Sequence, residues 1–260
     1  MSEVMLEPIR VEYVEHGGSD LSVVNAARAS FSRVSDWEWD EEGVPRLRAE
    51  DVRLIRFLAR GCRQAEWDEL LRGVVGTVSP DEAQELLHRV RSMAQHWTPF
   101  AHPHVTLRLR IPLFAARQLV KHQVGGVWSE ESRRYVDAEP TFWLPPEWSA
   151  RAADVKQGCA GAHHDQDGAR AAALRALQVA AQTYRELLAA GVAPEEARLV
   201  LPVSMMTTVV WTGSLLFWSR VVAQRADAHA QKAATREVAR RIDEVMRRLF
   251  PVSWVALRGG

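Results

Sequence analysis

Apolar residues along this 260-residue chain follow two different periods, and this constrains its fold more than any other feature. Residues 9–15 alternate apolar and polar side chains as a half-buried strand would, and the runs 105–110 and 205–212 are further predicted strands. Segments with helical spacing separate these runs. No repeat and no interior linker divides the chain. The sequence therefore predicts one domain that contains both strands and helices and spans residues 1–260.

Several of the predicted helices carry recognisable start signals. Asp20 is expected to cap a helix that ends near Ala29. Ser79 followed by Pro80 and Glu82 places a cap, a first-turn proline and a capping-box acid in order, which predicts a helix reaching about Ala94. The remaining helices are expected at 50–60, 66–75, from 112 onward, 169–189, 214–225 and 227–249, with irregular segments at 35–48 and 136–168.

The balance of charge excludes some classes of partner. Lys+Arg and Asp+Glu both number 33, so no net field draws the chain to nucleic acid or anionic lipid. No signal peptide is recognisable, and the most apolar run, 205–218, is too short and too rich in Thr and Ser to span a bilayer. Cys62 and Cys159 have neither disulfide-framework nor zinc-type spacing. We therefore expect a cytoplasmic protein with no membrane association.

The most polar stretch, residues 116–135, combines cations, carboxylates and hydroxyls with a flexible elbow. Arg117, Lys121 and His122 lie on its amphipathic first half, and Gly125-Gly126 leads into seven polar side chains at 129–135. Guanidinium groups offer bidentate geometry to phosphate or carboxylate, and glycine allows close backbone approach. The stretch predicts a site for a polar ligand, with a solvated charged loop as the alternative.

Other chemistries find weaker support. A metal-dependent hydrolase could use His96, His102 and His104, but no acidic residue lies near them in sequence. A serine hydrolase using His122 would lack the G-x-S-x-G elbow. Arg225, at the junction of the last two predicted helices, is well placed to stabilise a developing anion on a ligand.

Five ordered segments resemble motifs of the flavin-dependent thymidylate synthase family. They are the helix region 20–31, His96-Trp97-Thr98-Pro99-Phe100, the stretch 116–135 with Lys121-His122-Gln123 and Ser132, the run 197–202, and 225–231. The resemblance implies an α+β fold, a single mixed domain that assembles as a homotetramer with active sites built from several subunits. It further implies FAD as cofactor, a pyrimidine nucleoside monophosphate as substrate, methylenetetrahydrofolate as carbon donor and NADPH as reductant.

The resemblance also assigns site residues by position. Arg225 is expected to activate the uracil at N3, and His96 to lie near the flavin and the folate. The expected nucleotide contacts are Gln118, Lys121, Glu130, Glu131, Ser132, Arg133, Arg134, Arg198 and Arg225. The expected FAD contacts are Thr98, Lys121, His122, Gln123, Val124, Glu130, Ser214 and Arg220. No metal is expected.

The departures from the family pattern point to a divergent member. Lys121 and Gln123 replace the two arginines of the R-H-R motif, and Arg220 is a candidate compensating cation where the family has N-x-R. Residues 62–94 are expected to form a helical insertion. The default function is dUMP to dTMP conversion. The alternatives are C5-methylation of UMP, alone or with dUMP, in a nucleoside-antibiotic pathway, and a non-catalytic relative that only binds nucleotide.

Overall fold

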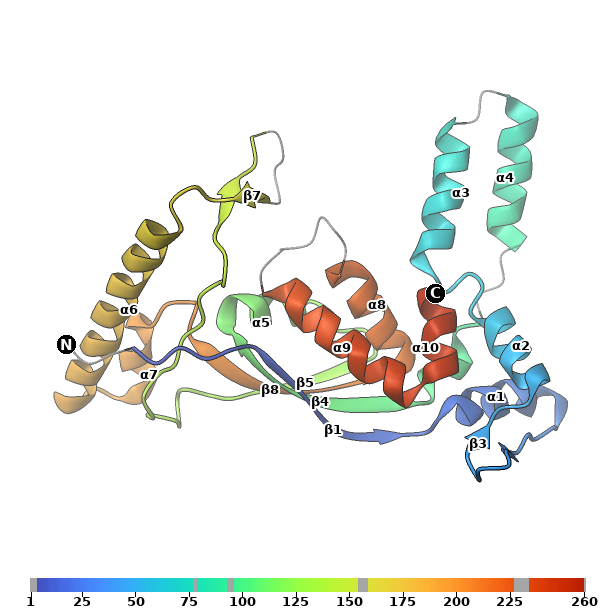
Figure 1. The fold of residues 1–260 in the computed structure, drawn as a ribbon, viewed down its shortest axis with the longest axis horizontal. Coiled ribbons are helices and arrows are strands. Elements are labelled where there is room, and N and C mark those ends of the chain that lie inside the picture. Colours follow the sequence, from blue (N-terminus) through green and yellow to red (C-terminus); the bar gives the residue numbers. More distant parts are fainter. Residues whose placement is uncertain (1–3, 77–78, 93–95, 154–158, 227–233, 260) are drawn as a thin grey trace. The chain divides into compact units, whose positions relative to one another are not determined.

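The computed structural model describes residues 4–76, 79–92, 96–153, 159–226 and 234–259. Its largest sheet has four strands in the order β1-β4-β8-β5, formed by β1 (Arg10–Gly17), β4 (His104–Pro112), β8 (Met206–Ser214) and β5 (Gly126–Glu130) (Figure 1). Helices and strands are both abundant, which confirms the predicted mixed α+β class.

The two strands in the middle of this sheet, β4 and β8, correspond to the predicted runs 105–110 and 205–212. In β4, Leu107 and Leu109 are fully buried. In β8, Val209 is fully buried and Trp211 is nearly so. β1 occupies a sheet edge, and its side chains are mostly exposed rather than alternately buried as predicted. β5 was not predicted, because its sequence is short and polar and begins with glycine.

The chain divides into two compact units, each assembled from separated segments. Unit 1 comprises Met1–Val14, Thr106–Thr212 and Gln224–Ile242, and unit 2 comprises Glu15–Val105, Gly213–Ala223 and Asp243–Gly260. Each unit is described below by itself. The expectation of a single domain stays a prediction.

Unit 1 contains most of the large sheet together with the helices that follow its strands. These are α5 (Leu113–Leu119), α6 (Gln166–Ala189), α7 (Pro194–Ala197), the short η3 (Arg198–Val200) and the first part of α9 (Thr235–Leu249). Phe142, Leu177, Ala181 and Met205 form a buried apolar cluster that joins α6 to the start of β8. The irregular segment predicted at 136–168 contains a small antiparallel pair, β6 (Ser149–Arg151) with β7 (Cys159–Ala162).

Unit 2 contains the N-terminal helices, the C-terminal helix and the predicted insertion. Its elements are α1 (Asp20–Arg28), η1 (Ala29–Phe31), α2 (Ala49–Leu58), α3 (Gln64–Gly76), α4 (Pro80–Ser92), η2 (Thr98–Ala101), α8 (Leu215–Arg225, of which the last two residues fall in unit 1) and α10 (Pro251–Arg258). The predicted loop at 35–48 contains a short hairpin, β2 (Glu38–Trp39) paired with β3 (Pro45–Arg46).

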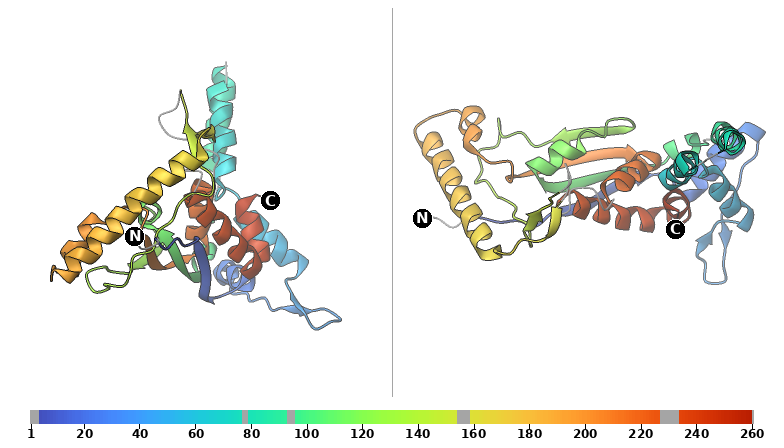
Figure 2. Two further views of the ribbon diagram at one scale, coloured as in Figure 1. Left: turned by 60° about the vertical axis from the view of Figure 1, so that its left-hand side comes forward. Right: turned by 90° about the horizontal axis from the view of Figure 1, so that it is seen from above.

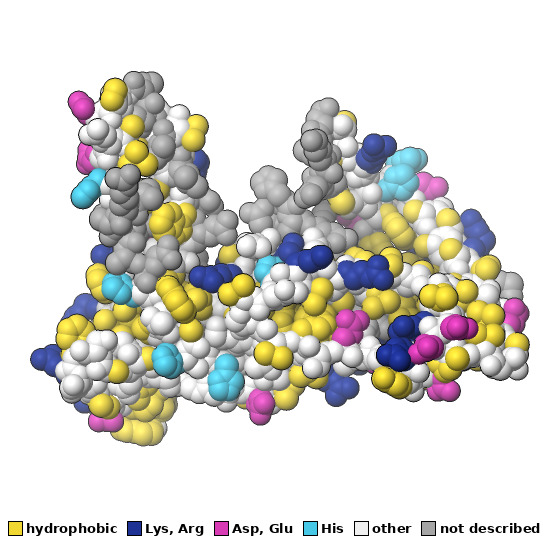
Figure 3. Space-filling model, turned by 180° about the vertical axis from the view of Figure 1, so that it is seen from behind, with side chains coloured by type: hydrophobic (Ala, Val, Ile, Leu, Met, Phe, Trp, Pro, Cys, Tyr) yellow, Lys and Arg dark blue, Asp and Glu magenta, His cyan; other side chains and the backbone are white. Residues whose placement is uncertain are grey.

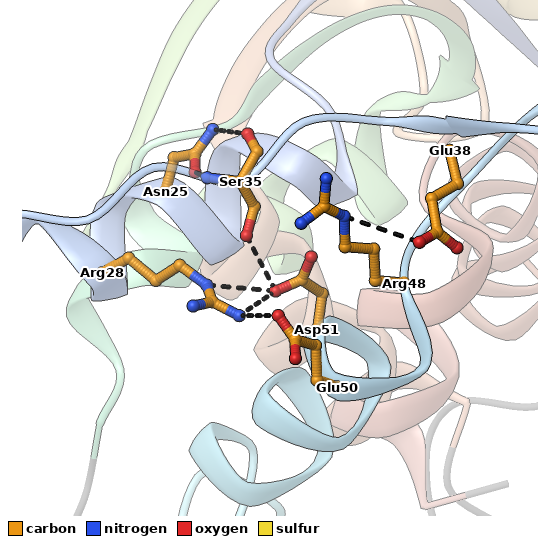
Figure 4. A network of polar contacts seen from close by, with 7 residues as sticks. All are labelled: Asn25, Arg28, Ser35, Glu38, Arg48, Glu50 and Asp51. Carbon is orange, nitrogen blue, oxygen red and sulfur yellow. Dashed lines mark hydrogen bonds and ion pairs between the residues drawn. The ribbon is translucent and has the colours of Figure 1, made fainter.

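A polar network fixes the start of this hairpin segment to α1 and α2 (Figure 4). The Asp51 Oδ1 atom accepts hydrogen bonds from Arg28 Nε at 3.0 Å and from Ser35 Oγ at 3.0 Å. Asn25 in turn bonds both the N–H and the carbonyl of Ser35. Because the Asp51 side chain is fully buried, the charge of Arg28 is needed to hold it in the protein interior.

Asp20 has a different role from the one predicted. Ser19 is the N-cap of α1, and Asp20 lies in the first turn, where its carboxylate accepts hydrogen bonds from the backbone N–H groups of Val252 and Ser253. Asp20 therefore caps the distant helix α10, which the sequence did not predict. The predicted start of the last long helix, at residue 227, lies outside the described residues.

Helices α3 and α4 lie side by side as a pair, seen nearly end-on in the right-hand view of Figure 2. Ser79 caps α4 as predicted, with its Oγ 3.2 Å from the Glu82 backbone nitrogen and 3.0 Å from the Glu82 carboxylate. The described part of the predicted insertion is therefore helical over Gln64–Gly76 and Pro80–Ser92.

Charged side chains of both signs are interspersed with apolar surface on the face shown in Figure 3, in keeping with the net charge of zero. In the described part of the chain, no helix has the length and apolar character needed to cross a membrane.

Candidate active site

A cavity of about 410 Å³ in unit 1 collects residues from four segments of the chain. α5 contributes to one wall, the end of β5 to a second, and η3 with the start of β8 to the rest. The lining residues are Leu113, Arg117, Glu130, Glu131, Arg133, Arg198, Leu199, Leu201, Val203, Met205, Met206 and Thr207. Four of the predicted nucleotide-binding residues therefore meet in one cavity, whose volume suits a small molecule.

Three arginines supply the positive charge of this cavity. Arg133 is only 6% exposed, and one of its terminal nitrogens donates to the Ala138 carbonyl. Arg198 Nε donates to the Glu195 carbonyl at 3.0 Å, and Arg117 is exposed. No ion pair joins any of the three to a carboxylate among the described residues, and the buried Nε of Arg133 has no hydrogen-bond acceptor there. Their charges remain available to an anionic ligand.

The two carboxylates of the cavity are already engaged. Glu131 pairs with Arg110 at 3.2 Å, and Glu130 accepts from Thr207 Oγ1 at 3.1 Å. Arg110 also bonds Glu7 at 2.9 Å and Thr141 at 2.8 Å, so this one residue of β4 links several segments around the cavity. Three arginines and two glutamates line the cavity, so its lining carries a net positive charge.

A pair of tryptophans lies beside the Glu130 carboxylate. The Trp128 Nε1–H donates to Glu130 Oε2 at 3.3 Å, and its ring meets that of Trp211 edge to face with centroids 5.0 Å apart. Trp211 is nearly fully buried, and Trp128 is half-buried. The edge-to-face packing fixes the orientation of Trp128 against the sheet.

A second polar cluster in unit 1 contains the expected catalytic arginine. Arg225 Nε donates to His122 Nε2 at 2.8 Å, and a terminal Arg225 nitrogen donates to the backbone carbonyl of Gln118 at 3.3 Å. The Gln118 side chain accepts at Oε1 from Thr235 Oγ1 at 2.6 Å. Gln118 is thus held at both its backbone and its amide, with the amide N–H₂ group left to donate.

The electrostatics of this cluster keep His122 neutral. Burial, and then the nearby Arg225 cation, lower the pKa of His122 from its ordinary 6.5 to about 4. The hydrogen bond from Arg225 requires an unprotonated Nε2, which agrees with that direction. Burial also lowers the pKa of Arg225, although an arginine remains charged at any physiological pH.

The remaining predicted residues of unit 1 lie at its surface. Lys121, Gln123 and Val124 are exposed on the turn before β5, where Gly125 has a φ of +87°. Arg134 pairs with Glu195 at 3.0 Å and lies over the Tyr135 ring, and the Ser132 hydroxyl is half-buried beside it. Ser132 and Arg134 do not line the cavity.

Four predicted residues belong to unit 2. His96 and Thr98 are exposed, and the His96 ring lies 5.4 Å from that of Phe57. Ser214 Oγ accepts from the Phe217 backbone N–H at 3.1 Å, so its first role is to cap α8. Arg220 is exposed on α8.

The residues carried over from the family motifs omit three residues of the site. Arg117 lines the cavity, Arg110 holds Glu131, and Thr235 fixes Gln118. Only Arg117 lies within the polar stretch that the sequence marked; the other two act through long-range contacts that no local pattern records. For the metal-dependent alternative, the described residues include no group of three His, Cys, Asp or Glu able to hold an ion.

Comparison with known proteins gives one consistent relationship. The family model described as "Thymidylate synthase complementing protein" matches residues 12–252. The flavin-dependent thymidylate synthase of Tropheryma whipplei (strain TW08/27) is 30% identical over 273 residues, which cover 98% of this chain and 95% of that protein. A protein of the same name from Thermus thermophilus is 30% identical over 246 residues, covering 95% of this chain and 74% of the relative.

Solved structures show the same relationship in three dimensions. The UMP/dUMP methylase PolB from Streptomyces cacaoi, bound with 5-Br dUMP, superposes with a TM-score of 0.72 at 27% identity, covering 98% of this chain and 96% of PolB. The same enzyme bound with 5-Br UMP also gives a TM-score of 0.72. Since the family model spans nearly the whole sequence and these relatives align along most of it, the chain belongs to the flavin-dependent thymidylate synthase family.

Proposed function

We propose that this protein methylates C5 of a uridine monophosphate nucleotide, with dUMP as the default substrate and dTMP as the product. Membership of the family and the similarity to a UMP/dUMP methylase support a nucleotide methyltransferase. FAD as cofactor, methylenetetrahydrofolate as carbon donor and NADPH as reductant are part of the proposal. So is a homotetramer as the working form.

The observation that carries the proposal is the trio of arginines without ion pairs to described carboxylates in the 410 Å³ cavity. Arg133 and Arg198 bond neutral carbonyl groups, so a phosphate that enters would gain charge-assisted bonds without breaking an ion pair. The apolar side of the cavity, with Leu113 and Met206, suits a ribose or base face. A nucleoside monophosphate carries a phosphate for the charged side of the cavity and a base for its apolar side.

Arg225 is the residue we propose to act on the pyrimidine. Two of its N–H groups are used by His122 and Gln118, which fix the guanidinium plane and leave further N–H groups to donate. A fixed cation beside N3 and its neighbouring carbonyl would stabilise the ring anion that makes C5 nucleophilic. A protonated His122 would repel Arg225, so its low pKa keeps this arrangement intact near neutral pH.

Within each unit, the residues expected at the flavin have side chains able to bind such a group. Lys121, Gln123 and Val124 offer a cation, an amide and apolar surface on one exposed turn, and Gly125 at positive φ lets the backbone turn sharply there. In unit 2, Arg220 and Thr98 are exposed and able to donate, and the Ser214 hydroxyl keeps its own proton for donation. When bound, the flavin would supply the reducing equivalents of the methylation.

UMP is the second candidate substrate, alone or beside dUMP. The favouring observation is that PolB, with a TM-score of 0.72, is a UMP/dUMP methylase. A relative that only binds nucleotide is the third reading, motivated by the changed residues Lys121 and Gln123.

Tritium release from 5-³H-dUMP and 5-³H-UMP, run in parallel with FAD, NADPH and methylenetetrahydrofolate, tests the proposal. Release from dUMP supports the default, and release from UMP supports the broader substrate range. Arg225→Gln should abolish release, whereas the exposed Arg170→Gln on α6 should leave it unchanged. No release from either nucleotide by wild-type protein that binds FAD would leave the binding-only reading.

A further inference from the structure

Unit 2 contains a cavity of about 370 Å³ that shares no residue with the site described above. It lies against helices α2 and α10. Its lining residues are Val52, Arg56, Arg60, Arg63, Pro251, Val252, Val255 and Ala256. Every polar side chain in that set is an arginine, and every other member is apolar. We name this set the α2–α10 pocket.

Two of the arginines lie on one side of the α2 end. Arg56 and Arg60 are four residues apart, and the Arg60 N–H bonds the Phe57 carbonyl at 3.2 Å, so the turn continues past Leu58. Both side chains are exposed, and neither forms an ion pair with a described carboxylate. Arg60 lies over the Phe57 ring at 5.7 Å, which limits its freedom without neutralising it.

The third arginine is held in place by a structured turn. Glu66 binds a terminal nitrogen of Arg63 and also accepts from the Gly61 N–H at 2.6 Å. This carboxylate therefore orients the Arg63 guanidinium. The Nε of Arg63 is buried and has no hydrogen-bond acceptor among the described residues. Such a donor is costly to leave unpaired, and a bound anion would satisfy it.

The opposite wall of the pocket is formed by α10. Val252, Val255 and Ala256 present apolar surface there. The N–H groups of Val252 and Ser253 are already bonded by Asp20, so the start of this helix is not what would attract an anion. Arginines near the C-terminal end of α2 could simply stabilise the helix dipole. That stabilisation is confined to the last turn of the helix, so it does not explain the presence of Arg63.

We propose that the α2–α10 pocket binds a small phosphate ester that carries an apolar or aromatic body. Guanidinium groups match phosphate oxygens in geometry and charge, and the apolar wall selects for a body beyond the phosphate. A phosphorylated co-substrate and a free regulatory metabolite share this chemistry. The inference does not rest on the proposed methylation, because binding here needs neither flavin nor uridine nucleotide.

Isothermal titration of the full-length protein with phenyl phosphate and with inorganic phosphate tests the site at low salt. Phenyl phosphate should bind more tightly than phosphate. Arg56→Gln/Arg60→Gln should weaken phenyl phosphate binding roughly tenfold or more. Arg53→Gln, an exposed arginine of the same helix that does not line the pocket, is the matched control and should stay within about twofold of wild type.

Two further variants separate this pocket from the nucleotide site. Val255→Ser should reduce the advantage of phenyl phosphate over phosphate by a few-fold, since it removes apolar wall. Phenyl phosphate can also enter the unit 1 cavity, so Arg198→Gln should leave unchanged only the binding component that Arg56→Gln/Arg60→Gln weakens. The proposal is overturned if wild type shows no binding, if Arg53→Gln weakens binding as much as the double variant, or if only Arg198→Gln abolishes it. A titration with 2′,5′-ADP and one with ribose 5-phosphate then distinguish the two sources of ligand by relative affinity.

Discussion

His122 shows how one neighbour decides the behaviour of a titratable side chain. Its Nε2 accepts from Arg225, and burial together with that cation holds its pKa at about 4. In an unfolded chain a histidine titrates near 6.5. Between these values the unfolded state binds the proton and the folded state does not. Folding is therefore progressively disfavoured as the pH falls from about 6.5 to 4, and this linkage vanishes above 6.5.

We expect the His122 ring signals in NMR spectra to titrate near pH 4. Arg225→Gln should raise this pKa only part of the way to 6.5, because burial is the larger cause and remains. The urea midpoint should fall more steeply with acid in wild type than in His122→Gln, whose amide still accepts from Arg225. A His122 signal that titrates near 6.5 in wild type would contradict the arrangement.

Thr235 is expected to act through Gln118. Its fully buried hydroxyl donates to Gln118 Oε1, so Thr235→Val removes a hydrogen bond at nearly constant volume. The expected result is a loss of about 1 kcal/mol of unfolding free energy and a KM for nucleotide raised several-fold. Thr235→Ser should restore the KM. Unchanged KM with reduced stability would make Thr235 purely structural.

At the scale of elements, α10 depends on a carboxylate from the far end of the chain. Asp20 is 4% exposed and accepts from two backbone N–H groups at the start of α10. Asp20→Ala should cost about 1–2 kcal/mol of unfolding free energy, measured by urea denaturation. The exposed Glu85→Ala on α4 is the control and should change stability by less than about 0.5 kcal/mol. Equal effects of the two would refute the capping role.

Arg110 holds several segments to strand β4. Removing its charge leaves Glu7 and Glu131 without their cation, so Arg110→Met should destabilise unit 1 by about 2 kcal/mol. Adding Glu7→Gln should recover part of the loss. Arg108→Gln tests the same strand at an exposed position and should be nearly neutral in a thermal melt. A neutral Arg110→Met would show that the ion pairs contribute little.

Local patterns predicted the elements whose signals are local. Ser79 with Glu82 marks the start of α4, and the run 105–110 lies within β4. The elements that were missed depend on partners elsewhere: β5 pairs with β8 despite its glycine, and α10 is completed by Asp20. The β2–β3 hairpin lies in a segment that contains Gly43 and Pro45, and these residues predict a loop. The contact that holds this segment, between Ser35 and Asp51, is not visible in the local sequence.

The same distinction holds for the site. Family motifs predicted Glu130, Glu131, Arg133 and Arg198, and these four do line one cavity. Arg110 and Thr235 could not be predicted, since their partners are 21 and 117 residues away in sequence.

At the scale of the whole molecule, we predict self-association. In unit 1, the side chains of Val124, Val127, Tyr135 and Leu199 are each between 71% and 82% exposed, and a contact between subunits would bury such apolar side chains. Light scattering coupled to gel filtration should give a mass about four times the 29.3 kDa of one chain. Leu199→Asp should shift the population toward smaller species. A wild-type mass equal to one chain would contradict the homotetramer.

The Trp128–Trp211 pair should give a spectroscopic signal of ligand binding in the cavity. Two indoles in edge-to-face contact couple their electronic transitions, and one of them donates to Glu130 at the cavity wall. A nucleotide that hydrogen-bonds the Glu130 carboxylate in place of Trp128 would release the Trp128 N–H. The Trp128 ring could then rotate relative to the buried Trp211 ring. Occupancy of the cavity would then register in the near-ultraviolet circular dichroism without any label, and Trp128→Phe would silence that signal while leaving the cavity lined as before.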